Sequence, residues 1–550
     1  MRTIRGNRRG LSVAAGVATA TLLLAACGGG GSGDADTADG EGGGGAEALT
    51  IGTTDKITTI DPAGSYDNGS FAVMNQVYPF LMNTPYGSPD VEPDIAESAE
   101  FTAPTEYTVT LKPGLKWANG NDLTASDVKF SFDRQTAIAA DNGPSSLLGN
   151  LESTEVVDDT TVIFHLKSEN DQTFPQILSS PAGPIVDEDV FSADELTSDQ
   201  EIVDGNAFAG QYAITSYTLN ELVTYEAYDG YQGLLGPAET PAINVKYFAD
   251  ASNLKLEVQQ GAVDVAFRSL SSTDVEDLQG DENVKVVEGP GGEIRYIVFN
   301  FDTQPYGAAQ PEADEDSALA VRQAVAHLID REAISEQVYK GTYTPLYSYV
   351  PAGLTGATES LKELYGDGAG GPDAAAAEQV LADAGVETPV SLSLQYSNDH
   401  YGPSSGDEYA LIKDQLESSG LFAVDLQTTE WVQYSEDRTA DVYPAYQLGW
   451  FPDYSDADNY LSPFFAEENF LVNHYSNPEV DDLISEQRVT TDPDERTAVI
   501  EEIQDTVAQD LSTVPYLQGA QVAVVGADVT GAEDTLDASF KFRYAALAKG

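Results

Sequence analysis

The sequence has a single cysteine, Cys27, and four histidines among its 550 residues. One cysteine cannot form an intramolecular disulfide, so the fold must rest on its hydrophobic cores. The histidines are dispersed, and no His-Glu-x-x-His pattern, serine elbow or phosphate-binding glycine loop is present. We therefore expect no metal site, no cofactor and no enzymatic activity.

Positive charge is scarce as well. The chain has 26 Lys and Arg against 91 Asp and Glu, which gives a net charge of −65. Nucleic-acid binding depends on cations that neutralise phosphates, so this class of function is excluded. A polybasic contact with lipid headgroups is disfavoured for the same reason. Two interpretations of the acidity remain open, namely salt tolerance of an exported protein and attraction of a cationic ligand.

Long apolar runs are also missing. The apolar residues 11–24 follow four arginines among the first nine residues, and they are fewer than the roughly 20 that span a membrane. The run ends in Leu24-Ala25-Ala26-Cys27, which is typical of a signal peptide and resembles a bacterial lipobox, in which the cysteine becomes lipid-modified. Residues 28–47 are rich in Gly, Ser and Asp and are expected to form a flexible tether. This predicts a protein held by lipid on Cys27 at the outer face of the cell membrane, with Sec and twin-arginine export both open.

The rest of the chain mixes strand and helix patterns. Residues 106–111 and 161–166 alternate apolar and polar side chains, as strands with one buried face do. Thr124 and Asp127 have the spacing of a capping box and predict the start of a helix. Further helices are expected at 317–339, 374–384 and 495–511, and strands at 514–517 and 522–525. The pattern predicts an α/β fold with mixed sheets.

Several ordered blocks resemble one family. Residues 92–134, EPDIAESAEFTAPTEYTVTLKPGLKWANGNDLTASDVKFSFDR, resemble the signature of the family 5 extracytoplasmic solute-binding proteins, the oligopeptide-, dipeptide- and nickel-binding components of ABC importers. The blocks that follow in the family's order are FAGQYAITSYTLNELVTYEAYDGY, LEVQQGAVDVA, VRQAVAHLIDREAISEQVYKG and HYSNPEVDDLI. The resemblance runs from about residue 48 to the C-terminus. The chain departs from the family at Ala118-Asn119 and at Gln211, both in turns.

The resemblance implies a two-lobed clamshell of the periplasmic-binding-protein type II-like kind, with an extra subdomain. Such a protein closes its lobes over a ligand. We expect a monomer that binds a peptide or other small solute and works with ABC permease subunits. The implied segments are 48–88, 208–290 and 517–550 for lobe I, 89–207 for the extra subdomain and 291–516 for lobe II, with a hinge near 293–301 and 514–517.

Residues 448–465, LGWFPDYSDADNYLSPFF, mix acids with aromatic side chains. Asp456, Asp458 and Glu467 stand at positions 1, 3 and 12 of a hypothetical calcium loop, but Leu461 replaces the glycine that the sharp turn requires and Pro463 interrupts the loop. Carboxylate pairs are too frequent in this composition to indicate a glycosidase. The remaining interpretation is the wall of a binding pocket.

Within this strip, Trp450-Phe451-Pro452-Asp453 resembles the W-x-x-D stretch of peptide-binding family members. The resemblance implies that the stretch presents backbone groups to a ligand main chain and that Asp453 pairs with the ligand α-ammonium, because an unpaired buried charge is costly. A solvated loop acid is the alternative for Asp453, and plain core packing is the alternative for two of the aromatic residues, Trp450 and Tyr454. Asp456 and Asp458 are expected to cap a helix or face solvent. The predicted ligand-binding residues here are Gly449, Trp450, Phe451, Asp453 and Tyr454.

The opposite wall is predicted from Ile60-Asp61-Pro62, which resembles the family's Leu-Asp-Pro motif. In relatives the next residues run along the ligand, which implies Tyr66 and Asn68 as contacts; a turn without ligand contact is the alternative. Arg295 and Arg322 are candidates for binding a ligand carboxylate, although a neighbouring acid is the expected partner of Arg322.

Three functions are compatible with these observations. The first is an oligopeptide receptor that delivers its ligand to a membrane permease. The second is the same fold with a non-peptide solute such as a nickel chelate, a sugar or an opine. The third is a surface sensor or adhesion module that transports nothing.

Overall fold

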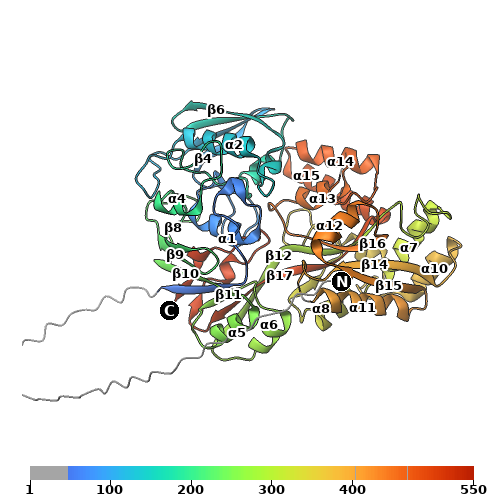
Figure 1. Ribbon diagram of the computed structural model, residues 1–550. Coiled ribbons are helices and arrows are strands. Elements are labelled where there is room, and N and C mark those ends of the chain that lie inside the picture. The colour runs from blue at the N-terminus through green and yellow to red at the C-terminus, as the bar shows by residue number, and fades with distance from the viewer. Residues whose placement is uncertain (1–47, 403, 468) are drawn as a thin grey trace, which may run out of the picture. The chain divides into compact units, whose positions relative to one another are not determined.

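The computed structural model describes residues 48–402, 404–467 and 469–550 (Figure 1). The predicted signal peptide, the lipidation site Cys27 and the predicted tether lie outside these residues. Within the part of the chain that the structure describes, no helix is both long enough and apolar enough to cross a membrane.

One large mixed sheet forms the framework. Its strands lie in the order β15-β14-β16-β12-β17-β11-β1-β10-β9-β8, and β13 also pairs with β17. Parallel pairs occur in two places, between β14 and its neighbours and between β1 and its neighbours. The strands are β1 (Leu49–Thr53), β8 (Tyr212–Thr218), β9 (Leu222–Ala227), β10 (Ala242–Tyr247), β11 (Val265–Phe267), β12 (Val284–Phe299), β13 (Tyr343–Pro345), β14 (Val390–Ser397), β15 (Phe422–Thr429), β16 (Ala445–Trp450) and β17 (Thr513–Gly526).

The two long strands β12 and β17 run side by side as an antiparallel pair in the middle of this sheet (Figure 1). β12 has 16 residues and β17 has 14, and their register shifts between Pro290 and Ile294 and again after Arg295. The first part of β12 is partly exposed, whereas every residue from 291 onward is buried. The strands predicted separately at 514–517 and 522–525 are therefore parts of one continuous strand.

A second sheet has four antiparallel strands in the order β4-β5-β7-β6. The predicted alternation is confirmed, because Tyr107, Val109 and Leu111 of β5 are buried and their neighbours are less so. Helix α2 packs on this sheet and begins with the predicted capping box at Thr124 and Asp127. The elements are β4 (Ala96–Ala103), β5 (Glu106–Leu111), β6 (Leu151–Asp158), β7 (Thr161–Leu166) and α2 (Ala125–Ile138).

Two predicted helices agree with the structure and one does not. Helices α10 (Ala374–Asp383) and α15 (Pro493–Asp510) lie within two residues of their predicted bounds. The helix predicted over 317–339 is instead two helices, α7 (Glu315–Leu328) and α8 (Arg331–Gln337). Ile329 has an extended backbone, and the Asp330 carboxylate accepts the Ala333 N–H, so Asp330 caps a new helix where the pattern predicted continuation.

The remaining helices lie around the two sheets. α5 and α6 pack near β11, β12 and β17, and α11 packs on β14 and β15 (Figure 1). Short bridges β2 (Met82–Asn83) with β3 (Glu92–Pro93) and β18 (Val529–Thr530) with β19 (Ala548–Lys549) complete the strands. The other helices are α1 (Asn68–Val77), α3 (Phe174–Ile177), α4 (Asp199–Asp204), α5 (Ala251–Gln259), α6 (Ser272–Leu278), α9 (Ser360–Leu364), α11 (Ser405–Ser418), α12 (Trp431–Thr439), α13 (Asp458–Phe465) and α14 (Pro478–Val489).

Three large hydrophobic clusters underlie these elements. We call them the terminal core, which joins Leu49 of β1 to Leu547; the small-sheet core, which surrounds the four-stranded sheet; and the central core, whose residues run from Ile294 to Ala538. The long strands β12 and β17 pass from the terminal core side of the sheet into the central core. The exact limits of lobe I, the extra subdomain and lobe II remain a prediction.

Candidate functional site

The predicted strip begins at the end of β16. Gly449 pairs with Arg295 and Trp450 pairs with Ile294 in the neighbouring strand β12. A Cβ atom at Gly449 would lie 2.9 Å from the Ile294 carbonyl oxygen and 3.0 Å from Cε1 of Tyr401. Glycine is therefore required by close packing, and it brings the strip directly against Arg295 and Tyr401.

Asp453 lies where the chain leaves the sheet, before α13. Its backbone N–H donates to Oδ1 of Asn459 at 2.9 Å, and its Oδ2 accepts Nδ2 of Asn459 at 3.1 Å. Its other carboxylate oxygen accepts the hydroxyl of Tyr66. Among the described residues, no Lys, Arg or His lies within ion-pair distance of this half-buried carboxylate. Removal from water raises the pKa of Asp453, and the hydrogen bonds from Tyr66 and Asn459 oppose that rise.

Tyr66 reaches Asp453 from the segment before α1, 387 positions away in the sequence. The residue as a whole is 42% exposed, but partial removal of its hydroxyl from water, together with the nearby Asp453 charge, raises the pKa of Tyr66. Asn68 is the first residue of α1 and is half-buried. The structure thus brings the two predicted walls together at Tyr66 and Asp453.

A buried ion pair holds the segment that carries Tyr66. Asp61 is fully buried and accepts two hydrogen bonds from Arg134 of α2, from Nη2 at 2.6 Å and from Nη1 at 2.8 Å. Asp61 also accepts the backbone N–H groups of Ala63 and Thr197. The Ile-Asp-Pro motif therefore fixes the backbone and leaves the residues after it to face the strip.

The predicted aromatic residues of the strip occupy three different environments. Trp450 donates its Nε1–H to Asn459 at 2.9 Å and packs edge-on against Phe464 at 5.1 Å between ring centroids. Tyr454 is 8% exposed, belongs to the small-sheet core, and donates its hydroxyl to Asp458 at 3.0 Å. Phe451 is the one predicted residue of the strip that lines the cavity described below.

Of the two alternatives expected for Asp456 and Asp458, exposure to solvent is wrong, because both residues are buried. Helix capping holds in part, since Oδ1 of Asp456 accepts the backbone N–H of Asp458, the first residue of α13, at 2.8 Å. Asp456 makes a two-bond ion pair with Arg496 of α15, with distances of 2.7 and 2.8 Å. Asp458 is fully buried; it accepts hydrogen bonds from Tyr454 and from the side chains of Ser462 and Gln487. The correction has a physical reason, since α14 and α15 come from later in the chain and supply the partners that local sequence does not contain.

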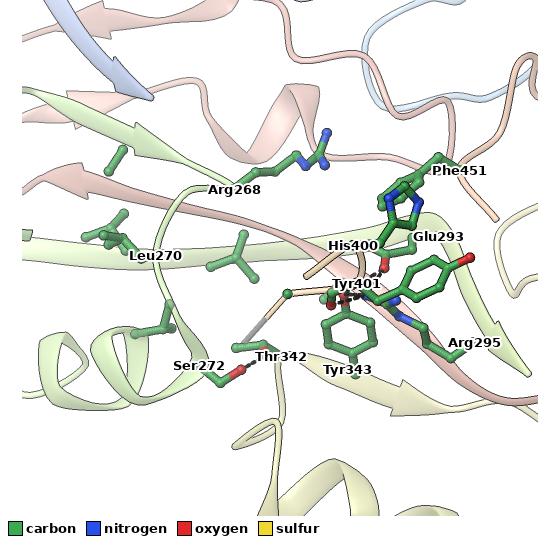
Figure 2. A pocket seen from close by; sticks show the side chains of 16 residues that line it. Arg268, Leu270, Ser272, Glu293, Arg295, Thr342, Tyr343, His400, Tyr401 and Phe451 are labelled. Carbon is green, nitrogen blue, oxygen red and sulfur yellow. Dashed lines mark hydrogen bonds and ion pairs between the residues drawn. The ribbon is translucent and has the colours of Figure 1, made fainter. Parts of the chain in front are cut away.

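A cavity of about 250 Å³ lies beside the strip (Figure 2). One side is formed by the end of β11, α6 and β17, and the other by β12, β13, residues 400–402 and Phe451. The charged residues among the 16 that line it are Arg268, Glu293 and Arg295. The cavity is thus built from segments of both predicted lobes.

Arg295 is 2% exposed and forms an ion pair with Glu293 at 2.5 Å. Its Nη2 donates to the Tyr401 carbonyl at 3.0 Å and to the Tyr343 hydroxyl at 3.2 Å. Burial acts to lower the pKa of Arg295, but the adjacent Glu293 charge raises it above the ordinary value. Arg322, the other predicted carboxylate ligand, is held in the core by the Asp510 carbonyl at 3.0 Å and lies over the ring of Phe301.

Sequence reasoning missed Arg268, Tyr401 and the role of His400. His400 stacks on Trp431 at 3.6 Å, and burial with the nearby Arg295 charge lowers the pKa of His400 to about 4, so it is neutral at ordinary pH. Arg268 follows β11 directly. The one available signal was position, because residues just beyond the ends of strands often line binding clefts in α/β folds.

Solved structures of similar fold support the predicted clamshell. The substrate-binding protein CtaP from Listeria monocytogenes matches with a TM-score of 0.76 and 22% identity, over 92% of this chain and 99% of that one. DppA from Helicobacter pylori in complex with peptide STSA matches with a TM-score of 0.70 and 19% identity, over 92% and 98%. The periplasmic binding protein type II-like clamshell with mixed sheets is therefore confirmed as the fold.

Sequence comparison gives the family. The glutathione-binding protein GsiB of Escherichia coli K12 is 26% identical over 515 residues, which cover 91% of this chain and 95% of that protein. The family described as bacterial extracellular solute-binding proteins, family 5, matches residues 90–471, which is more than half of the chain. Its members are solute-binding proteins of transport systems and not enzymes. The chain belongs to the bacterial extracellular solute-binding proteins of family 5.

Proposed function

We propose that this protein captures short peptides between its two lobes, with the peptide α-ammonium at Asp453, and delivers them to the permease of an ABC importer. The observation that carries the proposal is the Asp453 carboxylate, which is half-buried, lies at the meeting point of the two predicted walls and has no cationic partner among the described residues. A carboxylate removed from water without a cation is costly, and a ligand ammonium relieves that cost.

The other predicted residues take different parts in this proposal. Phe451, Tyr66 and Asn68 contact the ligand from opposite walls, and Gly449 lets the strip approach Tyr401 closely. Trp450 and Tyr454 support the strip from behind, since both pack into cores. Backbone groups of residues 451–453 pair with the ligand main chain, which gives affinity with little dependence on side chains.

Calorimetry with paired peptides tests the ammonium contact. Di- to hexapeptides with a free amino terminus are titrated in parallel with the same peptides after N-terminal acetylation. We expect acetylation to lower the affinity about 10- to 100-fold, because a charge-assisted hydrogen bond contributes about 1.5–3 kcal/mol. Equal binding of both forms would show that Asp453 does not receive the ammonium.

The cellular setting is proposed from the residues outside the described part of the chain. Cys27 becomes lipid-modified, residues 28–47 tether the body to the outer face of the membrane, and the protein acts as a monomer. A Cys27→Ala variant is expected to appear in the medium or soluble fraction instead of the membrane fraction. Retention of that variant in the membrane would contradict lipid anchoring.

The alternatives are distinguished by the bound molecule. A nickel chelate, a sugar or an opine in the same clamshell leaves the affinity for free and acetylated peptides equally low. A sensor or adhesion module leaves uptake unchanged when the gene is deleted. Mass spectrometry of the small molecules that co-purify with the protein identifies the ligand class directly.

A further inference from the structure

Arg268 is unusual in a chain whose acids outnumber its cations by 91 to 26. Among the described residues it forms no ion pair and its guanidinium donates no hydrogen bond to the protein. A guanidinium carries five N–H donors, and a half-buried position limits their access to water. The guanidinium N–H groups of Arg268 therefore have no protein acceptor, although the chain is rich in carboxylates.

The backbone conformation of Arg268 sets the direction of its side chain. Its φ is +56°, a left-handed conformation that is uncommon and unfavourable for residues other than glycine. Its N–H donates to the Val522 carbonyl of β17, which holds the turn after β11. The strained turn directs the side chain into the cavity toward Phe451, as Figure 2 shows.

Two aromatic rings fix the guanidinium without neutralising it. Its central carbon lies 4.2 Å from the ring centre of Phe540 and 5.6 Å from that of Phe451. A cation–π contact with the ring faces uses none of the N–H donors of the guanidinium, so these remain available for an acceptor. Phe451 belongs to the predicted ligand strip, so Arg268 is placed beside the proposed peptide site from the opposite side of the cavity.

The charges that line the cavity also favour an anionic group of the ligand. Its lining holds two arginines and one glutamate, and Glu293 is already paired with Arg295 at 2.5 Å. The cavity therefore has a net positive lining in a strongly acidic protein. Its volume of about 250 Å³ lies just below the roughly 300–1,000 Å³ of typical ligand pockets, which favours one end or one side chain of a short peptide.

We propose that Arg268 binds a carboxylate of the peptide ligand and so makes this protein selective for short peptides with an anionic group in the cavity. The inference rests on the proposed function, because it places the carboxylate of the same ligand whose ammonium meets Asp453. Two sources share this chemistry, the C-terminal carboxylate and an acidic side chain. A planar guanidinium accepts either one through two parallel hydrogen bonds.

The test uses pooled tripeptides of mixed sequence and the full-length protein. One pool has free termini, a second has C-terminal amides, and a third has C-terminal amides and one glutamate in every peptide. Each is titrated by calorimetry into the wild type and into the Arg268→Met and Arg268→Lys variants. Methionine keeps much of the apolar stem and the same Cβ, so the strain of the positive φ is unchanged.

In the wild type we expect amidation to lower the affinity about 10- to 100-fold. In Arg268→Met the same modification is expected to change the affinity less than about threefold, whereas Arg268→Lys keeps part of the discrimination. Recovery of binding by the glutamate pool in the wild type indicates that a side-chain carboxylate is accepted. A Lys116→Met control removes one exposed positive charge outside the cavity and is expected to behave as the wild type.

The outcomes separate this inference from the proposed function. If amidation costs the same affinity in the wild type and in Arg268→Met, or if neither amidation nor the added glutamate changes the affinity of the wild type while acetylation still lowers it, the role of Arg268 is wrong and peptide capture stands. If no pool binds the wild type, both proposals fall. The melting temperature of each variant shows whether a loss of binding is a loss of folding.

Discussion

The acids of the acid-and-aromatic strip at 448–465 lie in contrasting environments. Asp456 and Asp458 each have several protein partners, including Arg496 and Gln487, and serve to join α13, α14 and α15. Asp453, a few residues earlier, receives only neutral donors from Tyr66 and Asn459. An acid whose charge the fold has neutralised is therefore structural, and an acid left without a cation is available to a ligand.

The largest expected effect is on stability and concerns the ion pair between Asp456 and Arg496. An Arg496→Met substitution leaves Asp456 buried without its cation, so we expect the free energy of unfolding to fall by about 3–5 kcal/mol, as measured by urea denaturation. The double variant Asp456→Asn with Arg496→Met is expected to recover much of this loss, because no unpaired charge remains. A single variant as stable as the wild type would remove the contrast between the acids of the strip.

The second effect concerns ligand binding alone. An Asp453→Asn substitution keeps the side-chain volume and removes the charge, so affinity for peptides with a free amino terminus is expected to fall about 10- to 100-fold. Stability is expected to stay within about 1 kcal/mol of the wild type or to rise slightly, because a costly charge is lost. Asp122→Asn, at an exposed site, is the matched control. A collapse of the melting temperature in Asp453→Asn alone would make Asp453 structural.

The third prediction is a dependence on pH. Burial raises the pKa of Asp453 above the ordinary value near 4, so the carboxyl takes up a proton in the folded protein at a pH where an exposed aspartate remains charged. The neutral acid cannot pair with an ammonium, and peptide affinity is therefore expected to fall as pH is lowered from 7 toward 4. His400 does not contribute above pH 5, since its pKa is lowered to about 4. The dependence is expected to vanish in Asp453→Asn; its persistence there would assign it to another group.

The stability of the folded protein is expected to change with pH in the opposite direction to its affinity for peptides. Because the folded-state pKa of Asp453 is raised, this group favours folding below its unfolded pKa and loses that contribution as pH rises through the folded pKa. Urea denaturation of the ligand-free protein at several pH values, compared with Asp453→Asn, measures this contribution.

The smallest expected effect concerns the hydrogen bond between Tyr66 and Asp453. The Tyr66 hydroxyl donates to Asp453 and lowers the pKa of that carboxyl. A Tyr66→Phe substitution removes this donor, so the midpoint of the pH dependence of peptide binding is expected to move to higher pH. Affinity at pH 7 is expected to change by less than tenfold, because the carboxylate remains ionised at that pH and still accepts the hydrogen bond from Asn459. An unchanged midpoint would indicate that Tyr66 does not contact Asp453 in solution.

Local patterns predicted those elements whose signals are local. The alternation in β5 and β7, the capping box of α2 and the bounds of α10 and α15 all depend on residues within one turn or one strand. The break between α7 and α8 was missed because the apolar spacing continues through it. The sign of the break is Asp330, whose side chain caps α8. Helix boundaries are hard to predict from sequence, because ending a helix at a capping residue and continuing it differ little in free energy.

The α/β class, the likeness to family 5 and the position of the acid-and-aromatic strip could be predicted from the sequence alone, because composition and short spacings carry this information. Only the tertiary structure decided which charges are neutralised. Arg496 pairs with Asp456 across 40 positions and Tyr66 reaches Asp453 across 387, whereas Arg268 enters the cavity without an acid. Electrostatic pairing depends on distance in space, and the distance between residues far apart in the chain is set by the packing of the sheet and its helices.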